Sequence, residues 1–351
     1  VFVKPGGDYK ATVEVLVALV GGGDASSARS GLRTLPSLGG YEGDDIALTT
    51  PVGKLAAASL KARDLAPITA KDLEVESLAI ETGDGEKISV AEGSFGVFSM
   101  PVTPPDPEKA ALENLKIKDI QITERDGFCS AASVEAKELA LNAARDAAVT
   151  KLAVSPSRGP SISVAEASVA RLFIPENVEN QPQKAIVEKL RIRDISAPQL
   201  GAKVEKADLD MGADSVSLLI DKASIPGAIL KDFDIPTAPA TIEGSLDAEG
   251  KIKNNILTAK AALNLKDLFN LGADIVGNID DREPEKVNFV LRETGIFKYI
   301  TQEQRARLAF LSLFVPGAQE ALVGFLSRPG QTLSGSVTFE GRQPDFKFEL
   351  N

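Results

Sequence analysis

Hydrophobic and polar residues alternate along most of this chain, with the period of two that predicts β-strands. Leu115 and Ile117 fall on one side of such a segment, and the lysines between and after them fall on the other. One face of the expected sheet is therefore apolar and the opposite face is polar. After Asp119 the pattern changes phase, because Ile120 and Ile122 fall on the side of the lysines. This phase change predicts a bend or bulge at Asp119, a feature that curves a sheet.

The alternating segments repeat. The phrase Ile-Ser-Val-Ala-Glu at 88–92 returns at 162–166, and eight of the fourteen residues of 107–120 return 75 positions later. A fainter copy of this second phrase occupies 60–65. Internal repetition indicates that one supersecondary unit is stacked several times. We therefore expect about three β repeats within 45–227.

The two ends differ from the repeats. Residues 1–44 hold an apolar stretch that is either a strand or a buried helix, followed by a Gly-rich loop whose spacing lacks a phosphate-binding fingerprint. In 228–351 a further β segment precedes a change to helical periodicity at about 296–327, where Thr301 is a suitable N-cap. A closing hairpin is expected after these helices.

The expected fold is mainly β (β-rich α+β): a long curved antiparallel sheet built from internal repeats, with an apolar C-terminal helical pair packed on it. A short helix is also expected at 107–114, because Pro107 suits the first turn and good helix formers follow. The C-terminal pair is hydrophobic nearly all round and needs burial on more than one side. It is either a plug that completes the core, or a lid over a lipid-filled groove or a membrane-touching element.

Composition excludes several classes of function. The formal net charge of the 351 residues is −11, and lysine and arginine are scattered, so nucleic acid is a poor partner. The absence of histidine removes the common hydrolase triads and histidine metal sites, and we expect no enzyme, cofactor or metal site. Asp208, Asp210 and Asp214 have the spacing of a calcium loop but are better explained as a solvated strand face. Cys129 is expected to be a packed thiol.

The repeated strands with one apolar face, and the segment 287–350 of strand, apolar helices, Phe-Leu-Ser-Arg-Pro-Gly and strand, resemble the AsmA-like and repeating-β-groove lipid-transfer proteins of bacterial envelopes. The resemblance implies a short carrier or a module of a larger protein. Its location would be periplasmic or otherwise extracytoplasmic, with a signal peptide or anchor removed ahead of Val1. Its partners would be a lipid or other apolar ligand, and envelope proteins or a membrane surface.

Alternation and the apolar helices together give the candidate residues of an apolar groove. These residues are Leu115, Ile117, Leu190, Ile192, Phe310, Phe314 and Phe325. The function we expect is non-catalytic binding or transfer of a lipid or hydrophobic ligand in the bacterial envelope, on the concave apolar face of the sheet. The alternative is a structural or protein-interaction scaffold with a filled β core, in which the same residues are ordinary core.

Overall fold

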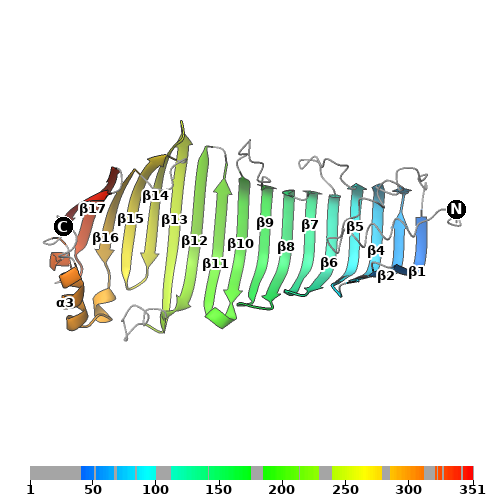
Figure 1. Ribbon diagram of the computed structural model, residues 1–351, viewed down its shortest axis with the longest axis horizontal. Coiled ribbons are helices and arrows are strands. Elements are labelled where there is room, and N and C mark those ends of the chain that lie inside the picture. Colours follow the sequence, from blue (N-terminus) through cyan, green and yellow to red (C-terminus); the bar gives the residue numbers. More distant parts are fainter. Residues whose placement is uncertain are drawn as a thin grey trace. The chain divides into compact units, whose positions relative to one another are not determined.

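A computed structural model describes most of the chain from Tyr41 onward (Figure 1). The described residues are 41–50, 53–66, 69–83, 85–99, 112–140, 142–174, 185–212, 214–228, 239–278, 285–311, 321, 323–325, 328–340 and 343–350. They form two compact units, which divide between Ile192 and Arg193, inside the segment of predicted repeats. Residues 1–40, with the predicted N-terminal strand and Gly-rich loop, lie outside the described residues.

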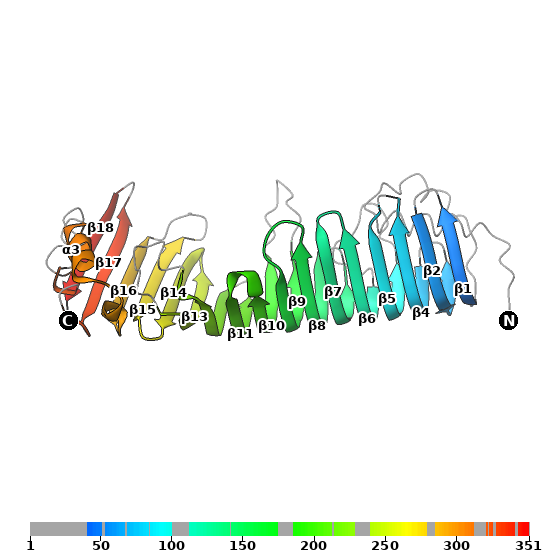
Figure 2. The ribbon, with the colours of Figure 1, turned by 90° about the horizontal axis from the view of Figure 1, so that it is seen from below.

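Unit 1 is an antiparallel meander, in which the strands lie side by side in chain order (Figure 2). Its strands are β1 (Tyr41–Thr50), β2 (Gly53–Ala62), β3 (Asp64–Ala66), β4 (Thr69–Thr82), β5 (Lys87–Ser99), β6 (Leu112–Glu124), β7 (Gly127–Leu139), β8 (Ala143–Pro156), β9 (Ile162–Phe173) and the first residues of β10 (Ile186–Ala197). Both β2 and the short β3 pair with β4.

Alternate strands of unit 1 are bent at two residues with left-handed backbone, five positions apart. These residues are Asp72 and Ser77 in β4, Asn114 and Asp119 in β6, and Asp146 and Lys151 in β8. Positive φ is costly for most side chains but tolerated by Asp and Asn. At Asp119, where φ is 50°, the ladder skips one residue and resumes in the same register. The bend that the phase change predicts at Asp119 is therefore confirmed.

Each bend moves the apolar positions by one residue. In β4 the apolar face is formed by Ala70, Leu73, Val75, Leu78 and Ile80, with spacings of three, two, three and two. All five are buried or half-buried, whereas the residues between them are exposed. A simple period of two would place two of these five side chains on the wrong face.

The bends of β4, β6 and β8 lie in register and form rows across unit 1. The repeated Ile-Ser-Val-Ala-Glu phrase belongs to one such row, because its alanines Ala91 and Ala165 lie opposite the bend residues Asp119 and Lys151. A bent strand and the unbent strand that follows it form one hairpin. The sequence repeat of 75 positions leads from Asn114 in β6 to Lys189 in β10, which is four strands later. The sequence repeat therefore spans two structural hairpins.

The helix predicted at 107–114 is wrong for its last three residues. These residues begin β6, where Leu112 pairs with Leu139 of β7 and Glu113 pairs with both Val97 of β5 and Glu138 of β7. Pairing with strands on both sides overrides the local helix preference. Residues 107–111 lie outside the described residues.

Unit 2 continues with antiparallel strands and carries the helical residues. Its elements are a 3-10 turn (Pro198–Leu200), β11 (Ala202–Met211), β12 (Ser215–Pro226), β13 (Thr241–Lys253), β14 (Ile256–Leu265), β15 (Phe269–Asn278), β16 (Lys286–Glu293), a second 3-10 turn (Ile296–Lys298), α3 (Gln302–Leu311), β17 (Thr332–Glu340) and β18 (Gln343–Leu350). Residues 321 and 323–325 are also helical. The predicted fold class, mainly β with an antiparallel sheet and a C-terminal helical element, is confirmed.

The strands of unit 2 lose the bends beyond β12. A bulge lies between Ile220 and Ala223, where Lys222 has a φ of 49°, and from β13 onward every ladder is continuous. Exposed and half-buried residues then alternate strictly along β14. Among the described residues, no helix has the length and apolar character needed to cross a membrane.

Candidate functional site: the apolar face

The apolar face of unit 1 is built from rows of hydrophobic side chains that run across the strands. One row contains Leu55, Ile80, Ile88, Ile122, Cys129, Val154 and Ile162, each opposite the next. A second row, between the two lines of bends, contains Leu73, Phe95, Leu115, Ala136, Ala147 and Val169. Neither row contains a charged residue, so this face offers apolar contact alone.

The opposite face of unit 1, the charged face, carries ion pairs between neighbouring strands. Lys61 pairs with Glu42 at 2.8 Å, and Arg63 pairs with the bend residue Asp72 at 3.0 Å. The hydrogen bond between Lys61 and Glu42 lowers the pKa of the carboxyl group and raises the pKa of the ammonium group. All four side chains are more than half exposed, so solvent screening keeps their contribution to stability small.

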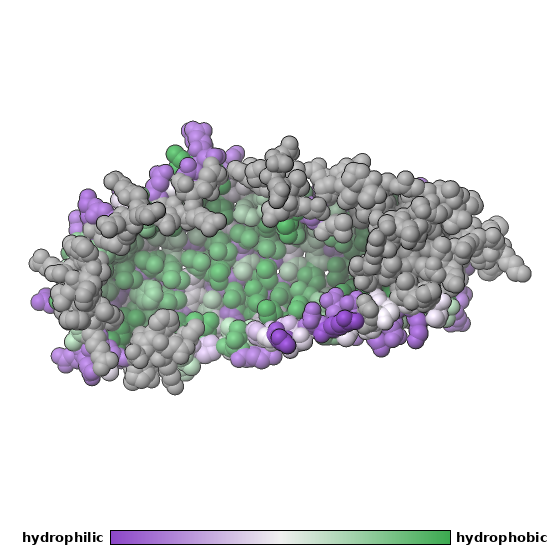
Figure 3. Space-filling view, in the orientation of Figure 1, coloured by the Kyte–Doolittle hydropathy of each residue, from purple (hydrophilic) through white to green (hydrophobic). Residues whose placement is uncertain are grey.

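Along the row that begins at Leu55, the side chains become more exposed from β2 toward β9. Leu55 and Ile80 are 8% and 9% exposed and form a buried cluster, whereas Val154 and Ile162 of the same row are 37% and 44% exposed. Figure 3 looks onto this face and shows hydrophobic residues lining a hollowed surface over β7–β9. Exposed apolar surface of this kind marks a site for a ligand, a partner or a membrane.

In unit 2 the apolar face contains an unbroken row of leucines, one from each strand from β13 to β18. This leucine row consists of Leu246, Leu263, Leu271, Leu291, Leu333 and Leu350, each opposite the next. The neighbouring row contains Ala248, Ala261, Ala273, Phe289, Gly335 and Phe348. Small side chains therefore occupy β13–β15 and aromatic side chains occupy β16 and β18.

Among the described residues, the helical ones pack on the β16–β18 end of the leucine row. We call the 3-10 turn at 296–298, α3 and the helical residues of 321–325 the helical cap. Ala321 and Phe325 of this cap are buried against Leu333, with Phe289, Leu291 and Phe348 packed around them. Over β11–β15 hydrophobic residues remain in view in Figure 3. The cap closes one end of the apolar face of unit 2 and leaves β13–β15 accessible.

The structure places the sequence-predicted groove residues in three different settings. Leu115 is buried and Ile117 half-buried on the apolar face of unit 1, and Leu190 and Ile192 are half-buried in β10. Phe325 belongs to the core under the helical cap. The side chain of Phe310, in α3, and the whole of Phe314 lie outside the described residues.

Sequence reasoning missed the leucine row and the cross-strand rows of unit 1. Their members come from strands that are separated by turns of different length, so only the register between strands brings them together. The strict alternation of β14, from Leu257 to Leu265, is the one local signal that points to this face.

No protein-family model, curated protein or solved structure matches the chain. The contrast between the two faces therefore carries the functional argument.

Asp208, the first acid of the calcium-like spacing, is paired with cationic side chains. Asp208 accepts a hydrogen bond of 2.7 Å from Arg193 and pairs with Lys206 at 3.2 Å. Burial raises the pKa of Asp208, but the hydrogen bonds from the two cations outweigh burial and leave this pKa below its usual value. Within the described part of the chain, no cluster of three carboxylate or thiol side chains has the geometry of a metal site.

Cys129 lies on the apolar face of unit 1, opposite Ile122 and Val154. Burial raises the pKa of its thiol, and the nearby carboxylate of Glu124 adds to this effect. The thiol is therefore mostly protonated at neutral pH and behaves as a small apolar side chain.

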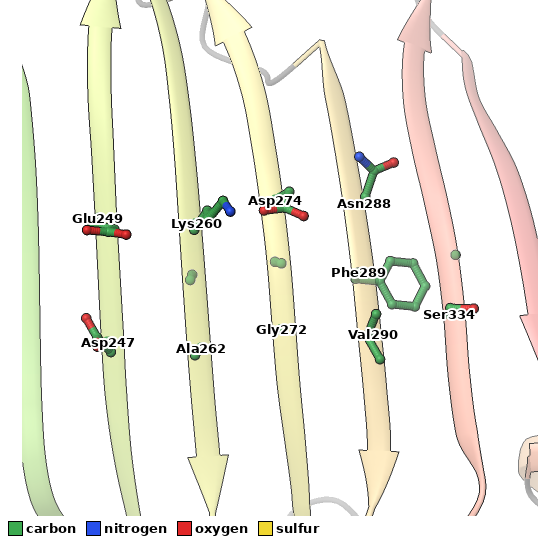
Figure 4. A pocket seen from close by; sticks show the side chains of 13 residues that line it. Asp247, Glu249, Lys260, Ala262, Gly272, Asp274, Asn288, Phe289, Val290 and Ser334 are labelled. Atoms are coloured by element: carbon green, nitrogen blue, oxygen red, sulfur yellow. The ribbon is translucent and has the colours of Figure 1, made fainter. Parts of the chain in front are cut away.

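The charged face of unit 2 has a depression of about 600 Å³ above Ala262 and Gly272 (Figure 4). Its rim carries Asp247, Glu249, Lys260 and Asp274, among other residues. Ala262 and Gly272 lie opposite each other in the ladder, and a Cβ on Gly272 would meet nothing within 4 Å. The hollow is therefore a gap left by two small residues. It is open to solvent and has charged residues on its rim, unlike the enclosed cavities that bind small ligands.

Proposed function

We propose that this protein is a non-catalytic, extracytoplasmic protein of the bacterial envelope that binds or transfers a lipid or another apolar ligand on its apolar face. The supporting observation is the row that ends in Val154 and Ile162, which stay 37% and 44% exposed while the reverse of the same strands is polar. Water contact with this surface is unfavourable by about 25 cal/mol per Å². An apolar ligand removes that contact.

The dimensions of the apolar face suit an acyl chain. Neighbouring strands lie about 4.8 Å apart, so the six strands from β4 to β9 extend about 24 Å across unit 1. One leaflet of a bilayer is about 15 Å of hydrocarbon deep, which an extended acyl chain spans. Each buried methylene contributes about 0.8 kcal/mol, so a chain of about ten methylenes supplies about 8 kcal/mol before the costs of association.

The apolar face would bind the hydrocarbon chain of a lipid and not its head group. The two unit 1 rows contain no charged side chain, and the ion pair of Lys61 with Glu42 lies on the opposite face of the sheet. A charged head group would therefore stay in solvent at the edge of the sheet. This arrangement favours transfer of lipids that share their tails and differ in their head groups.

The second candidate function is a structural or protein-interaction scaffold with a covered apolar face. The packing of Ala321 and Phe325 on Leu333 favours it, because it shows that helical residues of this chain can cover part of the face. Under this alternative a partner protein covers the remainder.

Native mass spectrometry after gentle purification tests the proposal, together with uptake of a fluorescent fatty acid. The matched variants are Ala147→Glu on the apolar face and Ala148→Glu on the charged face, at adjacent half-buried positions of β8. We expect co-purifying lipid and fatty-acid uptake in the wild type, loss of about tenfold or more in affinity for Ala147→Glu, and little change for Ala148→Glu. A wild type with neither lipid nor uptake contradicts the proposal.

A further inference from the structure

A carboxylate is buried on the apolar face of unit 2. Glu293 ends β16 and continues the row of Gly244, Leu265 and Phe269, which are otherwise uncharged. It is only 4% exposed. Burial of a carboxylate is costly unless hydrogen-bond donors satisfy it, so Glu293 needs donors around it to be stable at this position.

The two oxygens of Glu293 bind the first turn of the helical cap and the turn that follows the cap. Oε1 accepts a hydrogen bond from the backbone N–H of Phe297 at 3.3 Å, where the cap begins. Oε2 accepts a hydrogen bond from the backbone N–H of Gly330 at 2.6 Å, in the turn between the cap and β17. Each of the two hydrogen bonds satisfies one oxygen of the buried carboxyl group. A single side chain of the sheet is thus bonded to the start of the cap and to the turn that leads from the cap to β17.

The cap itself is held together by aromatic contacts. The rings of Phe297 and Phe325 lie 6.2 Å apart between centroids, and the guanidinium of Arg305 lies 4.5 Å above the Phe297 ring. Arg305 also donates a hydrogen bond of 2.7 Å to the carbonyl oxygen of Phe297. These contacts join the start of the cap to α3 and to the last helical residues.

The underside of the cap contacts the end of the leucine row closely. Phe325 is buried against Leu333, and a Cβ placed on Gly324 would overlap with the side chain of Leu350. Figure 1 shows α3 beside β16 and β17 at this end of unit 2. A change at Glu293 therefore acts on whether the end of the leucine row is covered.

We propose that Glu293 is the latch of the helical cap, and that this latch controls access of apolar ligands to the β16–β18 end of the leucine row. The claim that Glu293 holds the cap in place follows from the hydrogen bonds described above. The claim that it controls ligand access rests on the proposed function. The two parts have separate tests.

Hydrogen exchange measured by mass spectrometry tests the latch. Glu293→Ala removes both hydrogen bonds, and Glu293→Gln retains one acceptor, so we expect a graded increase in exchange at Phe297, Arg305 and Phe325, reaching roughly 10- to 100-fold for Glu293→Ala. Exchange in β13 and β14 stays unchanged. Glu249→Gln, at an exposed glutamate on the charged face, is the matched control and leaves cap exchange at the wild-type rate.

Stopped-flow uptake and release of a fluorescent fatty acid test the control of access. We expect both rates to rise in Glu293→Gln and further in Glu293→Ala, with Glu249→Gln at the wild-type rates. Unchanged cap exchange in both Glu293 variants overturns the latch. Faster cap exchange with unchanged fatty-acid kinetics overturns the control of access alone. A wild type that binds no fatty acid overturns the proposed function and the control of access, and hydrogen exchange still decides the latch.

Discussion

Phe289 and Phe348 meet edge to face across Gly335, with ring centroids 5.7 Å apart and planes at 67°. Gly335 of β17 lies directly opposite both phenylalanines in the ladder. The two rings can approach each other because the residue between them has no side chain. This aromatic pair forms the base on which Phe325 of the helical cap packs.

Replacement of Gly335 by alanine should destabilise unit 2. The new Cβ would lie 2.8 Å from Cζ of Phe289 and 2.7 Å from the carbonyl oxygen of Lys347, so the pair must separate. We expect a loss of about 1–3 kcal/mol in the free energy of unfolding, measured by urea denaturation. Gly272→Ala in β15 is the control, because its Cβ would meet nothing within 4 Å. Equal effects of the two substitutions would refute this packing argument.

Replacement of Asp119 by valine should destabilise unit 1. Asp119 has a φ of 50°, and a β-branched residue is strained there. We expect a cost of about 1–3 kcal/mol in chemical denaturation, whereas Asp119→Asn should stay within about 0.5 kcal/mol of the wild type. Gln121→Val, at an exposed position two residues further along β6, should be nearly neutral. A neutral Asp119→Val would show that the bend does not depend on this residue.

The sequence predicts the bend at Asp119 because the alternation of apolar and polar residues changes phase there. It does not predict the matching bends of Lys151 and Ser77, since neither residue type favours positive φ. Both lie in the same row as Asp119, on strands two positions away in the sheet, so the cross-strand register relates the three bends. A local pattern cannot contain this information.

In the C-terminal region, too, the sequence predicts local structure but not long-range contacts. Helical periodicity predicts the cap, and Thr301 is indeed bonded to Gln304 in a reciprocal capping arrangement at the start of α3. The partners of Glu293 are not predictable from spacing, because Gly330 is 37 residues further along the chain. The helix predicted at 107–114 is wrong at its end for a related reason, since pairing of Leu112 with β7 is a long-range contact.

The ion pair of Asp208 should make stability depend on pH in the acid range. Its pKa is lowered in the folded state, so the stabilisation is fully present above the unfolded pKa of about 3.9 and is lost as pH falls through the folded value. We expect Asp208→Asn to reduce the free energy of unfolding by about 1–2 kcal/mol at pH 7 and by progressively less below about pH 4. The measurement is urea denaturation from pH 2.5 to 7. An equal loss of unfolding free energy at pH 2.5 and at pH 7 would contradict this prediction.

Cys129 provides a native reporter of the apolar face. It is the single cysteine of the chain, and burial raises its pKa, so its reaction with a maleimide at pH 7 should be slow and should slow further when a fatty acid is bound. Mass spectrometry of the modified protein gives the rate. The control places the thiol on the opposite face, as Ser130→Cys in a Cys129→Ser background, where fatty acid should have no effect. Equal protection of both thiols would contradict binding on one face.

Photo-crosslinking with a diazirine-bearing fatty acid, followed by peptide sequencing, tests the proposed binding face most directly. Along β14 the apolar-face residues Ala261 and Leu263 alternate with Ala262 on the charged face, so the adducts distinguish the faces residue by residue. We expect adducts at Ala261, Leu263 and Leu271, and on the unit 1 row that contains Val154. Adducts concentrated at Ala262 and its neighbours around the charged-face depression, or no specific adducts at all, would contradict it.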